Sequence, residues 1–427
     1  MRLRVPGDKS ISQRALILGA LATGESRLRG VLPAADPRST ASALRTLGVE
    51  IPPLPHAGAE FRLPGLGLRG LVAPSAPLDF GNSGTGTRLL MGVLAAQPFA
   101  AVLDGDASLR SRPMGRVTRP LSLMGARFTS LGEPDRLPLR VEGAPLSSLD
   151  YDTPVASAQI KSALLLAGVA GGVPVLLTEP GISRDHTERM LSAAGAPVLR
   201  HVRDQGVRVE LRDVPSELQP LDLQVPGDLS SAAFVLLATF LGIGPQEVAI
   251  EGVGVNPTRH GVLGLFARMG GRLSLEDEQH AGGEPVATLV AQHSSLTAID
   301  ITEADVALAI DEIPALAVAA VRAEGRTRIT GARELRVKET DRIRALVLNL
   351  QALGVEVEEL DDGLEVQGTD RPLSGRVDAF HDHRIAMAFG VLAAQPENTI
   401  QVVGTESVEI SFPGFWTLLS ELVDADR

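Results

Sequence analysis

The 427-residue chain contains no cysteine, one tryptophan and one tyrosine, and fewer basic than acidic residues. The lack of cysteine excludes disulfides, thiolate metal sites and a cysteine nucleophile. A net charge of −12 and the scarcity of aromatic side chains argue against nucleic acid as a partner. Long apolar runs are also missing: the longest, Ala163 to Leu177, contains Gly171, Gly172 and Pro174, so we expect no transmembrane span.

The N-terminus does not resemble a signal peptide. Arg2 and Arg4 lead into a Pro-Gly turn, and the next apolar run contains Gln13 and Arg14. The length suits two or three domains, and 44% hydrophobic residues can form large cores. We therefore expect a soluble cytoplasmic protein.

Lysine is scarce as well. Of 40 basic residues only Lys9, Lys161 and Lys338 are lysine. Lysine differs from arginine in being a compact point charge with a tunable pKa. Because all three lie in segments with other unusual features, we interpret them as candidates for functional residues.

Two repeats organise the chain. The tetrapeptide Val-Pro-Gly-Asp occurs at 5–8 and 225–228, and serines and an apolar helical pattern follow each copy. Elsewhere an apolar helical pattern ends in a glycine, typical of the C′ position with positive φ, and leads into a short strand. These glycines are 70 to 84 residues apart: Gly48, Gly125, Gly195, Gly270 and Gly354.

The repeats predict an α/β protein of six similar units. The second tetrapeptide divides them three and three, which indicates two similar domains. We place one domain at 9–225 and the other at 1–8 and 226–427.

The first tetrapeptide alone is followed by two cations, Lys9 and Arg14. Ser10 or Ser12 can cap the helix that begins here, which leaves free N–H groups at its start. Such a helix end attracts anions, so cations beside it are favoured when an anion binds between them. The alternative is an ordinary capped helix with two solvated charges.

Other segments repeat this theme. The Gly-rich run 81–88 opens a helix, and Gly84 lets backbone N–H groups approach an anion, with Arg88 one turn later. Arg112 precedes Pro113, which we expect at the first position of a helix. The alternative for the Gly-rich run is a plain turn.

Ser157 and Gln159 stand at the start of the very apolar helix predicted over 163–169. The polar run 183–189 is better interpreted as a solvated first helical turn. The Gly-x-Gly-x-x-Gly string at 65–70 lacks a following helix, so we do not interpret it as a dinucleotide site.

A metal site is not expected. His381 and His383 are two residues apart without further ligands. Asp382 is better interpreted as the cap of a helix that has Arg384 in its first turn.

The densest run of charge contains Lys338, Glu339 and Arg342, with Lys338 and Arg342 one turn apart. Upstream, Asp311 and Glu312 lie inside an apolar stretch. Carboxylates in such surroundings have tunable pKa values and suit general acid or base catalysis. The alternative is a surface cluster of ion pairs. Together these features indicate an enzyme that acts on small polyanions without metal or thiol.

The motifs that carry these features resemble those of the 5-enolpyruvylshikimate-3-phosphate synthase family, in the family's order and over nearly the whole chain. They are PGDKSISQR, GNSGTGTR, RSRPMG, VASAQIKSALLLAG, SRDHTERM, VPGDLSSAAF, IDEIP, LRVKETDR and DHRIAMAF. The resemblance implies two inside-out α/β domains of three units each, with the active site in the cleft between them. It implies transfer of the enolpyruvyl group of phosphoenolpyruvate to the 5-hydroxyl of shikimate 3-phosphate, releasing phosphate. It implies no cofactor, and we expect a monomer without nucleic-acid or membrane partners.

The resemblance also assigns roles to individual residues. For shikimate 3-phosphate the implied contacts are Lys9, Ser10, Arg14 and Ser157, with Ser183 as a further donor. For phosphoenolpyruvate they are Lys9, Gly84, Arg112, Gln159, Arg342 and Arg384. Asp311 resembles the base that takes the hydroxyl proton, and Lys338 and Glu339 the groups that serve the methylene carbon; Lys9 counts among the catalytic groups too.

The chain departs from the family in places. Ile410 stands where many members carry Lys, and Lys161 or an arginine is a possible substitute for that contact. Glu334 stands where some members carry Asn. Gly84 is Ala in glyphosate-tolerant members, so we expect inhibition by glyphosate.

Two other functions are left open. The sister enzyme, UDP-N-acetylglucosamine enolpyruvyl transferase, has the same architecture, but its usual cysteine is impossible here. The second alternative is a catalytically silent anion-binding protein.

Overall fold

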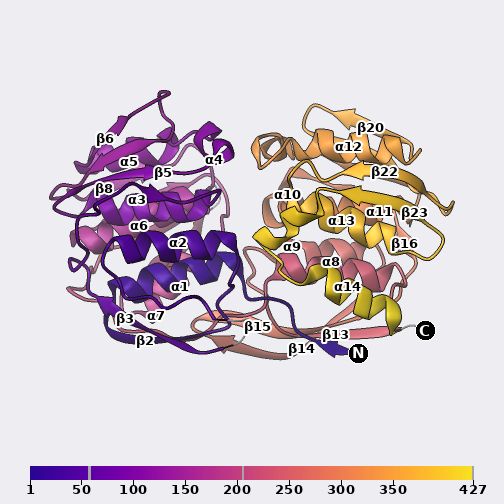
Figure 1. Ribbon diagram of the computed structural model, residues 1–427, viewed down its shortest axis with the longest axis horizontal. Helices are drawn as coiled ribbons and strands as arrows, with labels where there is room; N and C mark the ends of the chain where they lie inside the picture. The colour runs from indigo at the N-terminus through magenta and orange to yellow at the C-terminus, as the bar shows by residue number, and fades with distance from the viewer. Residues whose placement is uncertain (56–58, 204–205, 426–427) are drawn as a thin grey trace. The chain divides into compact units, whose positions relative to one another are not determined.

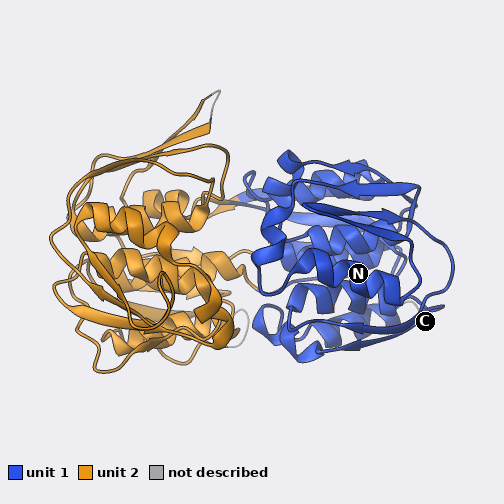
Figure 2. Cartoon of the chain, turned by 90° about the horizontal axis from the view of Figure 1, so that it is seen from above, with its two compact units in different colours: residues 1–6, 227–279, 285–427 blue, residues 7–226, 280–284 orange. Residues whose placement is uncertain are grey.

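The computed structural model describes residues 1–55, 59–203 and 206–425. The chain forms two compact units (Figure 2). Unit 1 consists of Met1–Pro6, Gly227–Gln279 and Pro285–Arg427, and unit 2 of Gly7–Pro226 and His280–Glu284. No helix in the described ranges is both long and apolar enough to span a membrane.

In the described part of unit 2 three sheets share one plan: a first strand runs parallel to the second, and the second antiparallel to the third. One sheet has the order β12 (Asp222–Gln224), β2 (Thr23–Arg29), β3 (Phe61–Leu66). The next has β4 (Leu78–Asp79), β5 (Ala100–Asp104), β7 (Leu139–Glu142), β6 (Arg127–Ser130). The last has β8 (Leu149–Asp152), β9 (Val175–Glu179), β11 (Gly206–Leu211), β10 (Leu199–Arg203).

The helices at the centre of unit 2 are α1 (Lys9–Leu21), α3 (Gly84–Ala95) and α6 (Ala158–Gly171), and nearly all their residues are buried. Helices that are apolar all round are stable only when enclosed, which explains their place inside the sheets. In Figure 1 α3 lies beside α6, against which it packs. The remaining helices are α2 (Ala35–Thr46), α4 (Ala107–Ser111), α5 (Gly115–Met124) and α7 (His186–Ala193).

Unit 1 repeats this plan. One sheet has the order β1 (Arg2–Leu3), β13 (Glu247–Gly254), β15 (Glu284–Gln292), β14 (Arg272–Ala281). The next has the order β17 (Asp300–Ile301), β19 (Arg326–Ile329), β21 (Gly363–Gln367), β20 (Val357–Leu360). The last is the parallel pair β22 (Ser374–Asp378) and β23 (Thr399–Val403). A short parallel pair, β16 (Leu296–Thr297) and β18 (Ala323–Glu324), is added.

Three buried helices again form the centre, and each packs against the other two: α8 (Leu229–Phe240), α11 (Ile313–Val321) and α13 (His383–Ala393). The others are α9 (Gly261–Arg268), α10 (Glu303–Ala309), α12 (Arg342–Ala352), α14 (Phe415–Asp424) and the 3₁₀ helices η1 (Arg333–Val337) and η2 (Thr405–Ile410). The inside-out α/β architecture expected from the resemblance is therefore confirmed, with a separate apolar core in each unit.

The chain passes from one unit to the other at each of the two tetrapeptides. In the other sheets the first strand is followed along the chain by its parallel partner, so β1 would be expected beside β2. Instead β1 pairs with β13 of unit 1, and β12 is the parallel partner of β2 in unit 2. Asp8 N–H donates to the carbonyl of Pro226 at 2.8 Å, and Asp228 N–H donates to that of Pro6 at 2.8 Å. At Gly7 a Cβ would lie 1.9 Å from the Gly30 carbonyl oxygen, which only glycine avoids.

Several local expectations need correction. The cap of α1 is Asp8, whose side chain accepts from Ile11 N at 2.8 Å, and not Ser10 or Ser12. Pro113 does not begin a helix, because α5 starts at Gly115. The charged run before residue 342 forms η1 and a turn, and α12 starts only at Arg342.

Other local expectations are confirmed. The glycines that end the repeated helical patterns all have positive φ, from 72° to 119°: Gly48, Gly125, Gly195, Gly270 and Gly354. The Gly-x-Gly string at 65–70 begins in β3, so it is a strand edge and not a dinucleotide turn.

Candidate active site

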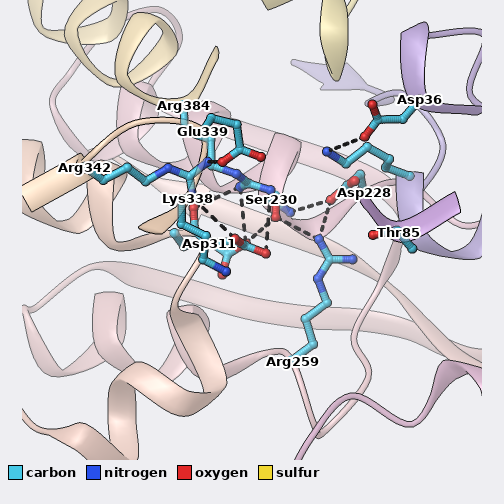
Figure 3. A network of polar contacts seen from close by, with 12 residues as sticks. Asp36, Thr85, Asp228, Ser230, Arg259, Asp311, Lys338, Glu339, Arg342 and Arg384 are labelled. Carbon is cyan, nitrogen blue, oxygen red and sulfur yellow. Dashed lines mark hydrogen bonds and ion pairs between the residues drawn. The ribbon is translucent and has the colours of Figure 1, made fainter. Parts of the chain in front are cut away.

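Arg342 is the centre of a charge cluster in unit 1 (Figure 3). Its side chain is 1% exposed at the start of α12. Nε donates to Asp382 Oδ2 at 2.7 Å, Nη2 to Glu339 Oε2 at 2.8 Å, and Nη1 to Asp311 Oδ1 at 3.4 Å. Burial alone lowers the pKa of Arg342, but the three carboxylates outweigh it and raise that pKa. Arg342 is therefore a permanent cation.

Asp382 and Arg384 extend the cluster from the start of α13. Asp382 caps this helix as expected, because its Oδ1 accepts from Arg384 N at 2.8 Å. Burial raises the pKa of Asp382, but Arg342 and His383 together outweigh burial and the pKa is lowered. Arg384 Nη1 donates to the backbone carbonyl of Asp311 at 2.9 Å, and its Nη2 lies 3.8 Å from Asp311 Oδ2. The carboxylate of Asp311 thus lies between two arginines.

Lys338 and Glu339 lie on the turn between η1 and α12. Their side chains are 25% and 24% exposed, so both are accessible to a ligand. The ammonium of Lys338 lies 4.0 Å from Glu334 Oε1. Within unit 1 the structure brings all five predicted residues into one polar region: Asp311, Lys338, Glu339, Arg342 and Arg384.

A second layer supports this region from the start of α8. Glu312 is fully buried and accepts a hydrogen bond from Ser230 Oγ. Arg259 Nη2 donates to Ser230 Oγ at 2.8 Å and to Asp228 Oδ1 at 2.6 Å. The second tetrapeptide therefore supplies Asp228 to a support network. Sequence reasoning missed Arg259, because it lies in no repeat and beside no other charged motif.

In unit 2 Lys9 and Arg14 lie along α1. Lys9 Nζ lies 3.3 Å from Asp36 Oδ2, at the start of α2. Arg14 is buried, and its guanidinium donates to Thr187 Oγ1 at 2.7 Å, to Ser162 Oγ at 3.0 Å and to a carbonyl of its own helix. Burial lowers the pKa of Arg14 to about 10, so it stays cationic at neutral pH. The alternative of a solvated charge is wrong for Arg14.

Ser157 and Ser183 meet at one carboxylate. Glu179, at the end of β9, accepts from Ser157 N at 3.0 Å and from Ser183 Oγ at 2.8 and 2.9 Å. Glu179 also contacts Lys161, whose side chain is fully buried between Glu179 and Glu188. Lys161 therefore does not supply the contact that Ile410 lacks. The run 183–189 is also mostly buried, so its interpretation as a solvated turn is wrong.

Gly84, Arg112 and Gln159 gather around Arg88 of α3. Arg88 Nη1 donates to Gln159 Oε1 at 2.9 Å. Gln159 Nε2 donates to Thr85 Oγ1 at 3.0 Å. A Cβ at Gly84 would lie 2.9 Å from Arg88 Nη1 and 3.3 Å from Arg112 Nη1. The absence of a side chain at Gly84 therefore leaves space in front of two guanidinium groups.

The polar regions can bind anions and move protons. Arginines, a lysine and helix starts neutralise negative charge. Carboxylates held against them stay ionised and can accept protons. Among the described residues no three His, Cys, Asp or Glu side chains are grouped as a metal site.

The family model described as "EPSP synthase (3-phosphoshikimate 1-carboxyvinyltransferase)" matches residues 1–419. A relative from Acidithiobacillus ferrooxidans named 3-phosphoshikimate 1-carboxyvinyltransferase is 49% identical over 420 residues, 98% of this chain and 94% of the relative. One from Alkalilimnicola ehrlichii, with the same name, is 48% identical over 421 residues, 98% and 92% of the two chains.

Solved structures agree. An EPSP synthase from Acinetobacter baumannii has a TM-score of 0.87 at 42% identity and covers 99% of this chain and 95% of its own. The enolpyruvyl transferase NikO from Streptomyces tendae has a TM-score of 0.72 at 18% identity, with 99% and 94% covered, and shows the fold alone.

Proposed function

Since the chain belongs to the EPSP synthase family, we propose how its side chains share the work of enolpyruvyl transfer. The reaction moves the enolpyruvyl group of phosphoenolpyruvate to the 5-hydroxyl of shikimate 3-phosphate and releases phosphate, a step of the shikimate pathway. It runs by addition and elimination, so protons must leave an oxygen and enter and leave a carbon.

Asp311 is the proposed base. It takes the proton of the 5-hydroxyl as the oxygen bonds to C2 of phosphoenolpyruvate. The ammonium of Lys338, next to the Glu339 carboxylate in the chain, delivers a proton to the methylene carbon. In the elimination the resulting methyl group gives a proton back to the pair Lys338 and Glu339, the double bond forms again, and the bond from C2 to the phosphate oxygen breaks. The observation that carries this proposal is Arg342, which holds the carboxylates of Asp311 and Glu339 on one guanidinium.

Both substrates are anions, so cations must offset their mutual repulsion. The proposed contacts for shikimate 3-phosphate are Lys9, Ser10, Arg14 and Ser157. Those for phosphoenolpyruvate are Lys9, Gly84, Arg112, Gln159, Arg342 and Arg384. In unit 2 this proposal is supported by two cations of α1, the buried Arg14 and the half-buried Lys9. In unit 1 it is supported by Arg342 and Arg384, which lie on either side of Asp311.

The two units are proposed to be the two enolpyruvyl transferase domains, with limits at 9–225 and at 1–8 with 226–427. Separate apolar cores support this division. The enzyme is proposed to act as a cytoplasmic monomer without metal or cofactor, because side chains alone supply the charge neutralisation and proton transfers. Light scattering after size exclusion should give a mass near 44.8 kDa.

Phosphate release from phosphoenolpyruvate tests the catalytic assignment. Wild type should release phosphate with shikimate 3-phosphate and not with UDP-N-acetylglucosamine. Asp311→Asn should lower kcat by about 10²- to 10⁴-fold, the usual range for loss of a general base. Asp361→Asn, at an exposed turn of the same unit, is the matched control and should keep wild-type kcat. Full activity of Asp311→Asn would overturn its role as base.

A further inference from the structure

Three charged side chains of unit 2 form a buried cluster: Lys161, Glu179 and Glu188. Their exposed fractions are 0%, 0% and 5%. Lys161 Nζ lies 2.9 Å from Glu179 Oε2 and 2.7 Å from Glu188 Oε1. Buried charges are costly to desolvate, and apolar replacements of similar volume are often no less stable. Stability alone therefore does not account for this cluster.

The charge state of the cluster follows from its geometry. Burial alone lowers the pKa of Lys161, but Glu188 and Glu179 outweigh it and raise that pKa, so the side chain is an ammonium ion. Burial raises the pKa of Glu188. A compact ammonium fits between two carboxylates where a planar guanidinium would need more room. This explains why one of the three lysines of an arginine-rich chain stands here.

The two carboxylates differ in what else they contact. Glu179 accepts from the backbone N–H of Ser157 and from Ser183 Oγ. In the described part of the chain, Glu188 makes no hydrogen bond to either serine. Ser157 is the residue that precedes the first turn of α6, and its hydroxyl makes no capping bond to that helix. Glu179 thus holds the backbone of Ser157 and leaves its hydroxyl to a ligand.

We propose that Glu179 is a positioning residue for shikimate 3-phosphate, acting through Ser157, with Ser183 and Lys161 holding its carboxylate. This inference rests on the proposed contact between Ser157 and the substrate. A free carboxylate behind a phosphate site would repel the phosphate, and Lys161 offsets that charge. Glu179 itself does not touch the substrate.

Calorimetric binding of shikimate 3-phosphate without phosphoenolpyruvate tests the proposal. Glu179→Gln keeps the shape but removes the charge that holds the backbone N–H of Ser157, and Kd should rise about tenfold, equal to about 1.4 kcal/mol. In steady-state assays KM for shikimate 3-phosphate should rise, while kcat and KM for phosphoenolpyruvate stay within about twofold.

Glu188→Gln is the matched control, because Glu188 contacts the same ammonium but neither serine. Its Kd should stay within about twofold of wild type. Wild-type binding by Glu179→Gln, or an equal loss in both variants, overturns the proposal, since the cluster would then act only on stability.

Ser157→Ala separates this inference from the function on which it rests. If Ser157→Ala binds shikimate 3-phosphate like wild type, the proposed contact of Ser157 fails and the inference falls with it. If Ser157→Ala weakens binding and Glu179→Gln does not, only the role of Glu179 fails.

If Glu179→Gln does not fold, a measurement on the wild-type protein tests the hydrogen bond from Ser157 N to Glu179 on which the proposal depends. The amide of Ser157, bonded to a buried carboxylate, should exchange with deuterium about 10³-fold more slowly than an unprotected amide. Exchange at the unprotected rate would overturn the proposal.

Discussion

Arg342 and Lys161 are both buried cations, and they show why the two residue types are not interchangeable. The planar guanidinium of Arg342 donates one hydrogen bond or more to each of Asp382, Glu339 and Asp311. Lys161 places one small charge between Glu179 and Glu188. The number and spacing of the acidic partners decide which cation fits.

Gly84 gives a prediction at the scale of one residue. In Gly84→Ala the new methyl group would press on Arg88 and Arg112. We expect KM for phosphoenolpyruvate to rise about tenfold, since a shift of under an ångström at a binding group can cost about that much. Glyphosate should inhibit wild type and inhibit Gly84→Ala less.

Inhibition curves for both proteins measure this effect. Gly264→Ala is the control, because a Cβ there meets no atom within 4 Å and the site is helical. Equal KM values in wild type and Gly84→Ala would show that the two guanidinium groups move aside.

At the scale of elements, aspartate caps four helices that carry or support the candidate site. Asp8, Asp228, Asp341 and Asp382 each accept a backbone N–H at a helix start. The repeated tetrapeptide ends in such a cap, which is why the serines after it lie within the helix. A carboxylate accepts this bond as well as a hydroxyl does and adds a favourable charge.

The cap of α13 predicts a pH dependence of stability. Burial raises the pKa of Asp382, but Arg342 and His383 together outweigh it, so that pKa is lowered from 3.8 in the folded state. Its stabilising contribution is therefore complete above about pH 3.8 and is lost as the pH falls through the folded pKa.

Asp382→Asn can still cap the helix but cannot titrate. Urea unfolding between about pH 3 and pH 7 should show a smaller loss of stability with acid for this variant than for wild type. Equal pH slopes in the two proteins would mean that Asp382 has a similar pKa in the folded and unfolded states.

At the scale of the whole molecule, the chain builds two apolar cores that share no residue. The only tryptophan, Trp416, belongs to unit 1, where its ring packs edge to face on Phe415 at 5.0 Å. Tryptophan fluorescence therefore reports on unit 1, whereas circular dichroism reports on both units.

The variant Leu89→Ala should change the unfolding transition measured by circular dichroism and not the one measured by fluorescence. Leu89 is fully buried in α3 of unit 2, and its truncation should lower stability by about 2–5 kcal/mol. We expect an earlier unfolding transition by circular dichroism and an unchanged transition by fluorescence. An equal shift of both signals would show that the units unfold as one cooperative body.

The sequence by itself determined the repeated plan, the positive-φ glycines and the family. These features are local: a period of helix and strand, a glycine that the backbone requires and motifs in a fixed order. It also singled out the residues now grouped around Arg342, because opposite charges in apolar segments are costly unless they are paired.

Only the tertiary structure decided the partners of those charges. The exchange of β1 and β12, the burial of Lys161 and the contacts of Glu179 and Arg259 join residues far apart in the chain. A sequence specifies which side chains need a partner, but which partner comes within 3 Å depends on how helices and strands pack, and packing is a property of the folded chain.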